Sequence, residues 1–288
     1  YSMKGQAMQV DKKADSLKEE IENNAKKYEV PPKDAMIDSV WKTVPGYNGL
    51  KVDIAASYEI MKKDGVFDEK KLIYKQIPPK VHLSELPPEP IYRAHPEKPV
   101  VSFLINVAWG NEYLPDMLKT LKKHNVKATF FLEGRWAKAN PELAKAIKEA
   151  GHEIGNHSYT HPNMKILSSE AARKEMKDTN EVLKAITGEY PSLFAPPSGA
   201  FRDDTVRVAD EFGMDTIMWS VDTIDWQKPT PDVLTQRVLS KMHKGAFVLM
   251  HPTESTARSM ETLIVNIKEK GLHLKTVTES LKEERILH

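Results

Sequence analysis

The sequence predicts an α/β protein whose larger part is built on a parallel sheet. From Pro99 onward, short apolar runs alternate with amphipathic stretches, which is the pattern of successive strands and helices. Polar side chains of the kinds found in active sites follow the ends of several runs, and the residues before Pro99 lack this alternation. These three observations favour a doubly wound sheet or a (β/α) barrel, preceded by a small separate domain.

The N-terminal residues 1–76 are expected to form that small α/β domain. Its polar segment 11–27 is helix-like, and two amphipathic stretches around 36–41 and 54–61 flank the turn residues 45–49. This mixture of one helix, a strong turn and short apolar stretches differs from the regular alternation that follows. The pattern therefore predicts a separate unit.

Residues 77–98 are rich in proline and are expected to form a linker. Proline fixes the backbone dihedral angle φ and restricts the residue before it, so such a stretch is stiff and extended. The remaining residues 99–288 then form the second domain.

Strands and helices are expected to alternate along this second domain. The predicted strands cover 100–108, 128–132, 153–155, 193–194, 216–219, 246–250 and 273–277. The predicted helices cover 113–123, 141–150, 168–186, 203–212, 230–242 and 257–270. In parallel α/β architectures the carboxyl ends of the strands meet at one edge, where active sites collect.

The candidate functional residues follow the carboxyl ends of these predicted strands. They are Asn106, His157, His161, Pro196–Gly199, Asp222–Trp226 and His251. Because His157 and His161 are four residues apart, their imidazoles can lie on the same side and bind zinc, cobalt or nickel. Two histidines are only half of a metal site, and a surface or capping role is the alternative. A third ligand would decide between the two interpretations.

Composition and charge exclude several classes of protein. The chain has 288 residues, of which 40% are hydrophobic and 29% charged, and its formal net charge is +1. It lacks the basic excess expected of a nucleic-acid binder, so no nucleic-acid partner is predicted. No apolar run approaches the roughly 20 residues that span a bilayer, so no transmembrane segment is predicted. The absence of cysteine excludes disulfides and thiolate chemistry.

Over Pro99 to about Leu281 the sequence resembles the NodB-homology polysaccharide deacetylases, also called carbohydrate esterase family four. The family's second motif is intact as His157–His161, its fourth as Asp222–Trp226 and its fifth as Leu249–His251. The segments 128–131 and 151–157 also match the family framework. The resemblance implies a deformed (β/α) barrel of the NodB-homology type. Trp109–Tyr113, together with the N-terminal unit, is similar to the sporulation-associated branch of the family.

Two motifs depart from the family pattern. The first motif carries two adjacent Asp residues in the family, whereas this sequence has Asn106 and Val107 within the run 104–108. In the third motif, Ala195 stands where the family usually carries Arg. The resemblance therefore implies that the general base, the third metal ligand and the Arg that orients the base are all absent.

The resemblance implies hydrolysis of N-acetyl groups on peptidoglycan or chitin-like N-acetylglucosamine glycans. His157 and His161 would be metal ligands, His251 the general acid, and Asp225 the partner that orients His251. Asn106 would stand at the position of the base, but an amide cannot accept a proton at neutral pH. Loss of a general base lowers a rate by roughly 10²- to 10⁴-fold. A divalent metal (zinc, cobalt or nickel) is expected to be weakly bound or absent.

A set of neighbouring side chains is expected to line the glycan groove. These are Trp226, Tyr159, Pro197, Ser198 and Leu249. A tryptophan beside a sugar groove can act as a stacking platform, although a tryptophan beside a strand is more often a core residue. We keep Trp226 as a groove residue because it belongs to the fourth motif.

Three functional hypotheses remain open at this point. The first is an extracytoplasmic, envelope- or spore-associated family member with impaired or lost deacetylase activity, preceded by a signal or anchor upstream of Tyr1. The second is a non-catalytic glycan-binding or scaffold protein of the envelope or spore. The third is a working hydrolase in which Glu112 or Asp116 replaces the missing carboxylate and Arg202 the missing Arg; solvated residues and a surface salt bridge are the alternatives.

Overall fold

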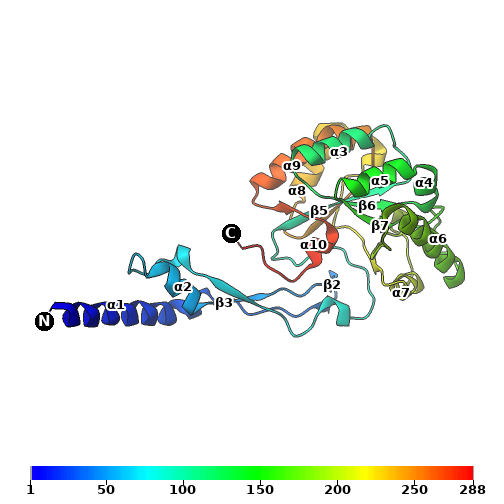
Figure 1. The fold of residues 1–288 in the computed structure, drawn as a ribbon. Helices are drawn as coiled ribbons and strands as arrows, with labels where there is room; N and C mark the ends of the chain where they lie inside the picture. Colours follow the sequence, from blue (N-terminus) through cyan, green and yellow to red (C-terminus); the bar gives the residue numbers. More distant parts are fainter. Residues whose placement is uncertain (1, 288) are drawn as a thin grey trace. The chain divides into compact units, whose positions relative to one another are not determined.

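The computed structural model describes residues 2–287, which form two compact units (Figure 1). One unit takes the chain up to Ala35, Gly46–His82 and the C-terminal segment from Glu283, and the other takes Met36–Pro45 and Leu83–Lys282. These units divide the chain at other positions than the expected domains 1–76 and 99–288. None of the described helices combines the length and apolar composition needed to cross a membrane.

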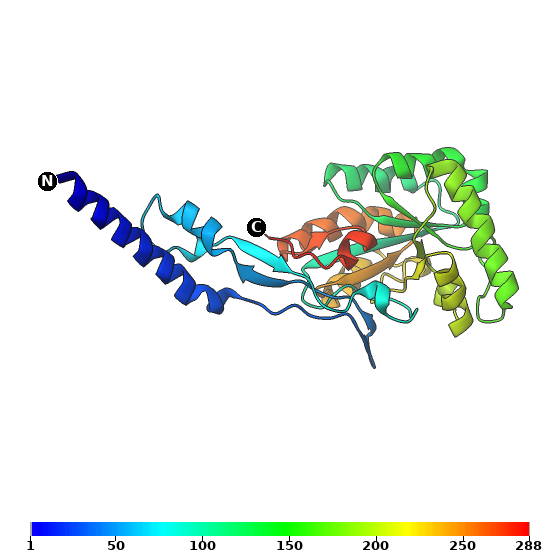
Figure 2. The ribbon, with the colours of Figure 1, turned by 60° about the horizontal axis from the view of Figure 1, so that its bottom comes forward.

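The first unit packs two helices on a two-stranded antiparallel sheet (Figure 2). Its elements are α1 (Ser2–Ala25), β3 (Gly49–Val52), α2 (Ile54–Met61) and β4 (Tyr74–Ile77). Leu17, Ile21 and Ala25 of α1 lie one helical turn apart and are buried against an apolar cluster that includes Met61. This is the helix predicted at 11–27, and it begins earlier, at Ser2.

The second unit is built on a parallel sheet. Its strands are β5 (Val100–Val107), β6 (Thr129–Leu132), β7 (Glu153–Asn156), β8 (Leu193–Phe194), β9 (Asp215–Thr216), β10 (Val221–Asp222), β11 (Ala246–Met250) and β12 (His273–Leu274). The strand order is β10-β11-β5-β6-β7-β8-β9, β12 pairs with the start of β5, and every pairing is parallel. The prediction of a parallel sheet is confirmed. A short antiparallel hairpin, β1 (Met36–Asp38) and β2 (Lys42–Val44), also belongs to this unit.

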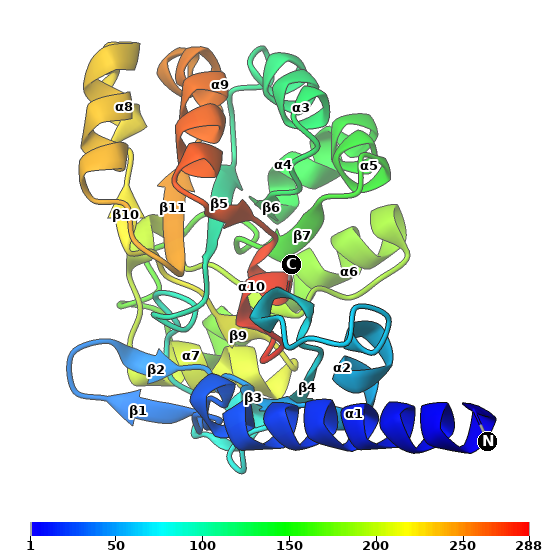
Figure 3. The same cartoon turned by 90° about the vertical axis from the view of Figure 1, so that its left-hand side faces the viewer.

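Helices follow most of the strands and cover the sheet. They are α3 (Leu114–Lys123), α4 (Gly134–Ala139), α5 (Pro141–Glu149), α6 (Ser169–Thr187), α7 (Asp203–Glu211), α8 (Pro231–Ser240), α9 (Glu254–Glu269) and α10 (Val277–Leu281). Figure 3 shows α8, α9 and α3 side by side along the strands. The helices α4 and α10 were not predicted, because they are too short to show a helical period in the sequence.

Two predicted strands were wrong in extent. The run 216–219 contributes only Thr216 to β9, because the chain leaves the sheet there to reach β10. The run 273–277 ends as a strand at Leu274, because the Thr276 side chain accepts a hydrogen bond from the Glu279 N–H and begins α10.

The sheet curls until its two edge strands are joined by the short segment 217–220. The Ile217 N–H donates to the Phe194 carbonyl of β8 at 2.8 Å, and the Ser220 N–H donates to the Phe247 carbonyl of β11 at 3.0 Å. Ile91 lies at this seam, since its N–H donates to the Thr216 carbonyl at 2.9 Å. Residues 217–220 therefore complete a deformed barrel rather than leaving an open, doubly wound sheet.

Alternation along β5 decides which side chains face the inside of the barrel. Phe103, Ile105 and Val107 belong to the apolar cluster shared with α3, α8 and α9, so they face the helices. Because strand side chains alternate, Leu104 and Asn106 face the opposite side, which is the barrel interior. Asn106 is thus the last inward-facing residue of β5.

We predict that Gly155→Ala destabilises the barrel. A Cβ at Gly155 would lie 2.5 Å from Cδ1 and 2.6 Å from Cε1 of Phe131, so the ring must move. Overpacking of this kind costs about 1–3 kcal/mol, measurable by chemical denaturation. Phe131→Ala in the same chain removes both clashing atoms, so the double variant should lose less stability than the sum of the single variants. Additive losses would contradict the steric explanation.

Candidate active site

The carboxyl edge of the barrel gathers the motif residues predicted from the sequence. Asn106 lies near the end of β5, and His157 follows β7 directly. Asp225 lies in the turn after β10, and His251 directly follows β11. Neighbouring parallel strands therefore bring together residues that are far apart in the chain.

The His157 ring is held with one nitrogen available to the site. Its Nδ1–H donates to the Ala195 carbonyl oxygen at 2.8 Å, which leaves the lone pair on Nε2. Burial, followed by the repulsive effects of His161 and His251, lowers the pKa of His157 to about 3. The imidazole is therefore neutral at physiological pH, which is the form that binds a metal.

His161 lies beside His157 on a loop that a carboxylate holds. The two ring centroids are 5.1 Å apart with 73° between the planes. Glu175 of α6 accepts hydrogen bonds from the backbone N–H groups of Tyr159 and Thr160, both at 2.8 Å, and from the Thr160 hydroxyl at 2.7 Å. Sequence reasoning missed Glu175, because no motif links α6 to the histidine loop.

The partly exposed His251 and the fully buried Asp225 form a hydrogen-bonded pair. The His251 Nδ1–H donates to Asp225 Oδ1 at 2.9 Å, and the His251 backbone N–H donates to Oδ2 at 2.6 Å. The Thr256 hydroxyl also donates to Oδ2, at 2.7 Å. These contacts fix the orientation of the His251 ring. Because Nδ1 is engaged by Asp225, Nε2 is the ring nitrogen that could exchange a proton with a ligand. The Trp109 ring stacks on the imidazole at 5.8 Å, with 10° between the planes.

Asn106 and Val107 occupy different surroundings. The Asn106 side chain is buried, and its Oδ1 has no hydrogen-bond partner, which is costly for a buried polar atom. Val107 is fully buried in the apolar cluster between β5 and the helices. The interior at the end of β5 thus presents an amide oxygen, while the following residue faces away from the site.

The residues present do not fit a three-ligand catalytic metal site. Among residues 2–287, no three His, Cys, Asp or Glu side chains are grouped as metal ligands. His157 and His161 offer two imidazole ligands. The amide oxygen of Asn106, which has no hydrogen-bond partner, is uncharged and is a weaker metal ligand than a carboxylate. Catalytic zinc sites use three protein ligands and keep one position open.

Glu112, Asp116 and Arg202, the groups considered as substitutes for the missing carboxylate and Arg, are exposed or already engaged in other contacts. Glu112 and Asp116 are exposed, Asp116 in the first turn of α3. Arg202 donates to the Leu167 carbonyl and to the Asp204 carboxylate, so its guanidinium is committed to a structural contact.

Glu133 is a buried carboxylate that sequence reasoning missed. It follows β6 at the same edge, is 3% exposed, and accepts from Arg135 Nε at 3.2 Å. Its N–H donates to the Val107 carbonyl oxygen at 2.9 Å, so the backbone lies beside the end of β5. Only its position after an apolar run could have indicated it.

The expected groove residues come from three loops and one strand. Tyr159 is half-buried on the histidine loop, while Pro197 is buried and Ser198 exposed on the loop after β8. Leu249 lies in β11 between Val248 and Met250 of the helix-facing cluster, so alternation turns it inward. Trp226 is 58% exposed beside the fully buried Asp225.

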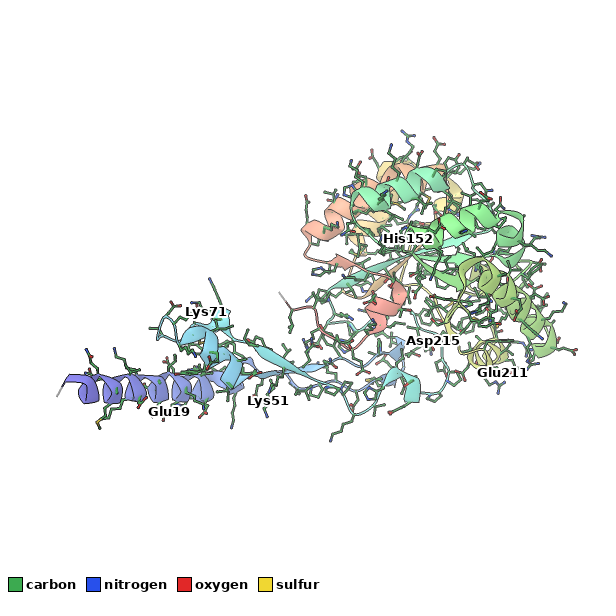
Figure 4. The ribbon with its side chains drawn as sticks, viewed as in Figure 1. Glu19, Lys51, Lys71, His152, Glu211 and Asp215 are labelled. Atoms are coloured by element: carbon green, nitrogen blue, oxygen red, sulfur yellow. The ribbon has the colours of Figure 1, made fainter. Side chains whose placement is uncertain are left out.

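We predict that His152 makes stability depend on pH. His152, labelled in Figure 4, accepts the Ala128 N–H on Nδ1 at 3.0 Å, and burial together with Lys127 lowers its pKa to about 4. Because the folded-state pKa is below the unfolded value, the unfolded chain binds the proton first as the pH falls. The contribution of His152 to the free energy of unfolding is therefore complete above pH about 6.5 and is lost toward pH 4. The free energy of unfolding should fall by up to about 1.4 kcal/mol per pH unit in this range. Denaturation of His152→Gln at several pH values should give a shallower slope, and an unchanged slope would contradict the assignment.

Comparison with known proteins agrees with this geometry. The family model for polysaccharide deacetylase matches residues 93–217. The chain is 56% identical over 286 residues to the uncharacterized protein YlxY of Bacillus subtilis, covering 99% of this chain and 90% of that protein. It is 35% identical over 171 residues to a peptidoglycan-N-acetylglucosamine deacetylase of Bacillus cereus, covering 58% of this chain and 62% of that one.

A solved structure matches over nearly the whole chain. It is a wild-type protein described as a CE4 family pseudoenzyme from Bacillus anthracis, with 57% sequence identity and a TM-score of 0.90. The match covers 94% of this chain and 96% of that chain. The deformed (β/α) barrel, the retained motifs and these similarities agree, and the chain belongs to the polysaccharide deacetylase family, carbohydrate esterase family four.

Proposed function

We propose that this chain is a glycan-directed family member whose N-deacetylation activity is impaired or lost. The observation that carries the proposal is the end of β5, where the inward residue is the amide Asn106 and the next residue is the core residue Val107. The His251–Asp225 pair that would donate a proton is assembled. A carboxylate that would accept one is absent from the His157–His161 group among the described residues.

The proposed target is an N-acetylglucosamine glycan of the cell wall, either peptidoglycan or a chitin-like oligosaccharide. The name of the Bacillus cereus relative, a peptidoglycan-N-acetylglucosamine deacetylase, supports this class of substrate. A cell-wall target implies an extracytoplasmic location, in the envelope or at the spore. The N-acetyl group would lie near His157, His161 and His251.

The proposed metal chemistry follows from the ligand set. Deacetylases of this family generally use a divalent metal. His157 and His161 supply two imidazole nitrogens, and an amide oxygen does not replace the charge of a carboxylate. We therefore expect zinc, cobalt or nickel to bind weakly or not at all, and no step of a reaction is assigned to the metal.

We predict that Asn106→Asp increases both metal affinity and activity. The new carboxylate would stand at the position of the base, and its negative charge beside two imidazoles would favour a divalent cation. Zinc affinity, measured by calorimetry, should rise by roughly 10- to 100-fold, the scale of a partner that does not itself bind the metal. Acetate release from tetra-N-acetylchitotetraose should rise by up to roughly 10²- to 10⁴-fold, the usual contribution of a general base.

Asn125→Asp is the matched control for this change, because Asn125 is exposed and lies at the amino end of the barrel strands. It should leave zinc affinity and acetate release unchanged. Rapid acetate release by the unaltered chain would overturn the proposal and favour a hydrolase with a substitute carboxylate. Glycan binding without acetate release in either form would favour the alternative of a non-catalytic binding or scaffold protein. A variant of the Bacillus anthracis protein described as having restored enzymatic activity supports the choice of this assay.

We predict that Val107→Asp lowers stability. Val107 faces the apolar cluster, so an Asp there would place an unpaired charge among apolar side chains unless the end of β5 moves. An uncompensated buried charge costs roughly 3–5 kcal/mol. Denaturation of Val107→Asp beside Val107→Ala separates the effect of charge from the loss of volume. Equal stability of the Asp and Ala variants would show that residue 107 can turn away from the core.

A further inference from the structure

A cavity lies at the amino end of the barrel strands, at the opposite end from the histidine pair. Its volume is about 560 Å³, within the roughly 300–1,000 Å³ typical of small-molecule sites. The lining includes Lys127 just before β6, His152 directly before β7 and Lys275 directly after β12. His157 follows the carboxyl end of β7, so this amino-end cavity is separate from the candidate active site.

His152 brings a buried hydrogen-bond donor to the amino-end cavity (Figure 4). It is 4% exposed, and its Nδ1 accepts the Ala128 N–H, so the proton of the neutral ring is on Nε2. The Phe130 ring packs against the imidazole, with centroids 5.0 Å apart, and helps to hold it. Within residues 2–287, no acceptor lies in hydrogen-bond reach of Nε2. A buried N–H without a partner is costly, so an oxygen of a ligand would stabilise it.

Two of the three acids that line the cavity are paired with lysines. Glu189 lies 2.8 Å from the ammonium group of Lys148, and Glu279 lies 2.8 Å from that of Lys282. Each pair brings together one negative and one positive charge. Neither pair therefore adds a net charge to the cavity.

The third acid, Glu153, is held by neutral donors. Its Oε1 accepts the Thr129 hydroxyl at 3.0 Å and the Thr278 N–H at 3.1 Å. Its Oε2 accepts the Thr278 hydroxyl. Both oxygens are therefore already engaged in hydrogen bonds, although the negative charge of the carboxylate is not matched by a cation.

Two lysines of the cavity, Lys127 and Lys275, have no carboxylate partner in the part of the chain that the structure describes. Lys127 donates to the Ala150 carbonyl oxygen at 2.7 Å, which holds its ammonium group beside Gly151. The two ammonium groups, less the charge of Glu153, leave one positive charge. A monoanion matches this charge, whereas a cation would be repelled.

Apolar surface accompanies these polar groups. It is contributed by Ile154, Leu183, Pro191, Leu274 and the ring of Tyr190. A bare inorganic anion would leave this surface uncovered, and a dianion would carry more charge than the lining balances. An organic molecule with an apolar body and one carboxylate matches both the charge and the surface.

We propose that the amino-end cavity binds the carboxylate of an organic acid or of a peptide chain end. One carboxylate oxygen accepts the His152 Nε2–H, and the other faces the ammonium groups of Lys127 and Lys275. The apolar body of the ligand packs on the apolar side of the cavity. Binding here needs no metal and no acid at the end of β5, so it is independent of the proposed deacetylase chemistry.

The test is calorimetric titration of the full chain with benzoate at low ionic strength. Benzamide has the same ring without the charge and should bind at least roughly tenfold more weakly. N-acetyl-alanyl-alanine and its C-terminal amide repeat this comparison for a peptide end. Tighter binding of the dipeptide than of benzoate assigns the cavity to a chain end, and the reverse assigns it to a free organic acid. Inorganic phosphate tests the alternative anion.

His152→Asn separates the donor on Nε2 from the structural role of the ring. The Asn oxygen can accept the Ala128 N–H in place of Nδ1, but the shorter side chain does not reach the position of Nε2. Benzoate affinity should fall by roughly 10- to 100-fold, the scale of a hydrogen bond to a charged group. His152→Gln, whose amide reaches farther, should keep more of the affinity.

Lys275→Gln tests the contribution of charge. It should weaken benzoate binding and make the remaining affinity less dependent on the NaCl concentration, because one ammonium group is removed. Lys119→Gln is the matched control, since Lys119 is exposed on α3 and lies outside the cavity. It should change neither the affinity nor its salt dependence.

Three results would overturn the proposal: no binding of benzoate or the dipeptide by the unaltered chain, equal affinity for benzoate and benzamide, or unchanged benzoate affinity in folded His152→Asn. Phosphate binding tighter than both carboxylates would also reject it. Thermal denaturation reports whether each variant is folded. Should His152→Asn fail to fold, the Nε2–H resonance of His152 in the labelled, unaltered chain decides. It should shift when benzoate is added, and a constant resonance would reject the site.

Discussion

Strand β5 lies between β11 and β6, and backbone pairing on both sides fixes the direction of its side chains. Because strand side chains alternate, a one-residue slip would exchange every inward and outward residue. The pairing of Asn106 with Phe131 and of Val107 with Leu132 therefore sets which residue faces the site. The chemistry of the carboxyl edge depends on this register, since a carboxylate is useful at the inward position and costly at the outward one.

The His251–Asp225 pair matches the family pattern, whereas the group formed by His157, His161 and the end of β5 matches it only in part. One half of the site has the buried Asp225 carboxylate, the His251 imidazole that it holds, and the Thr256 hydroxyl of α9. The other half has the two imidazoles of the loop after β7, but the end of β5 carries an amide and a valine where the family has two Asp residues. The loops also keep strained positions, with a positive φ at Ser158, His161, Ser198, Ile224 and Lys228, each costing about 1–3 kcal/mol. Strain is maintained only where surrounding contacts enforce it, so the shape of the edge persists beyond the loss of its acids.

The sequence pattern predicted most of the strands and helices of the barrel and the group of candidate site residues. The elements and residues that it did not predict have physical explanations. The long strand β5 was predicted from its apolar run and α6 from its helical period, whereas the two-residue strand β10 is too short to show either signal. Ile91 fell within a proline-rich stretch interpreted as a linker, and only tertiary hydrogen bonding reveals its place at the barrel seam. Motif spacing predicted the histidines and Asp225 as candidate site residues, and they lie at the same edge of the barrel. Glu133 and Glu175 could not be predicted from the sequence, because strand register places the Glu133 backbone beside the end of β5 and helix packing brings Glu175 to the histidine loop.

Anomalous diffraction at the zinc edge, from crystals grown with one equivalent of zinc, tests most directly whether His157 and His161 lack a third protein ligand. We expect no fully occupied ion held by His157, His161 and a third protein ligand. Full occupancy with a third ligand, such as the Glu133 carboxylate, within bonding distance would contradict this expectation, because the chain would then possess the metal site that its β5 residues lack.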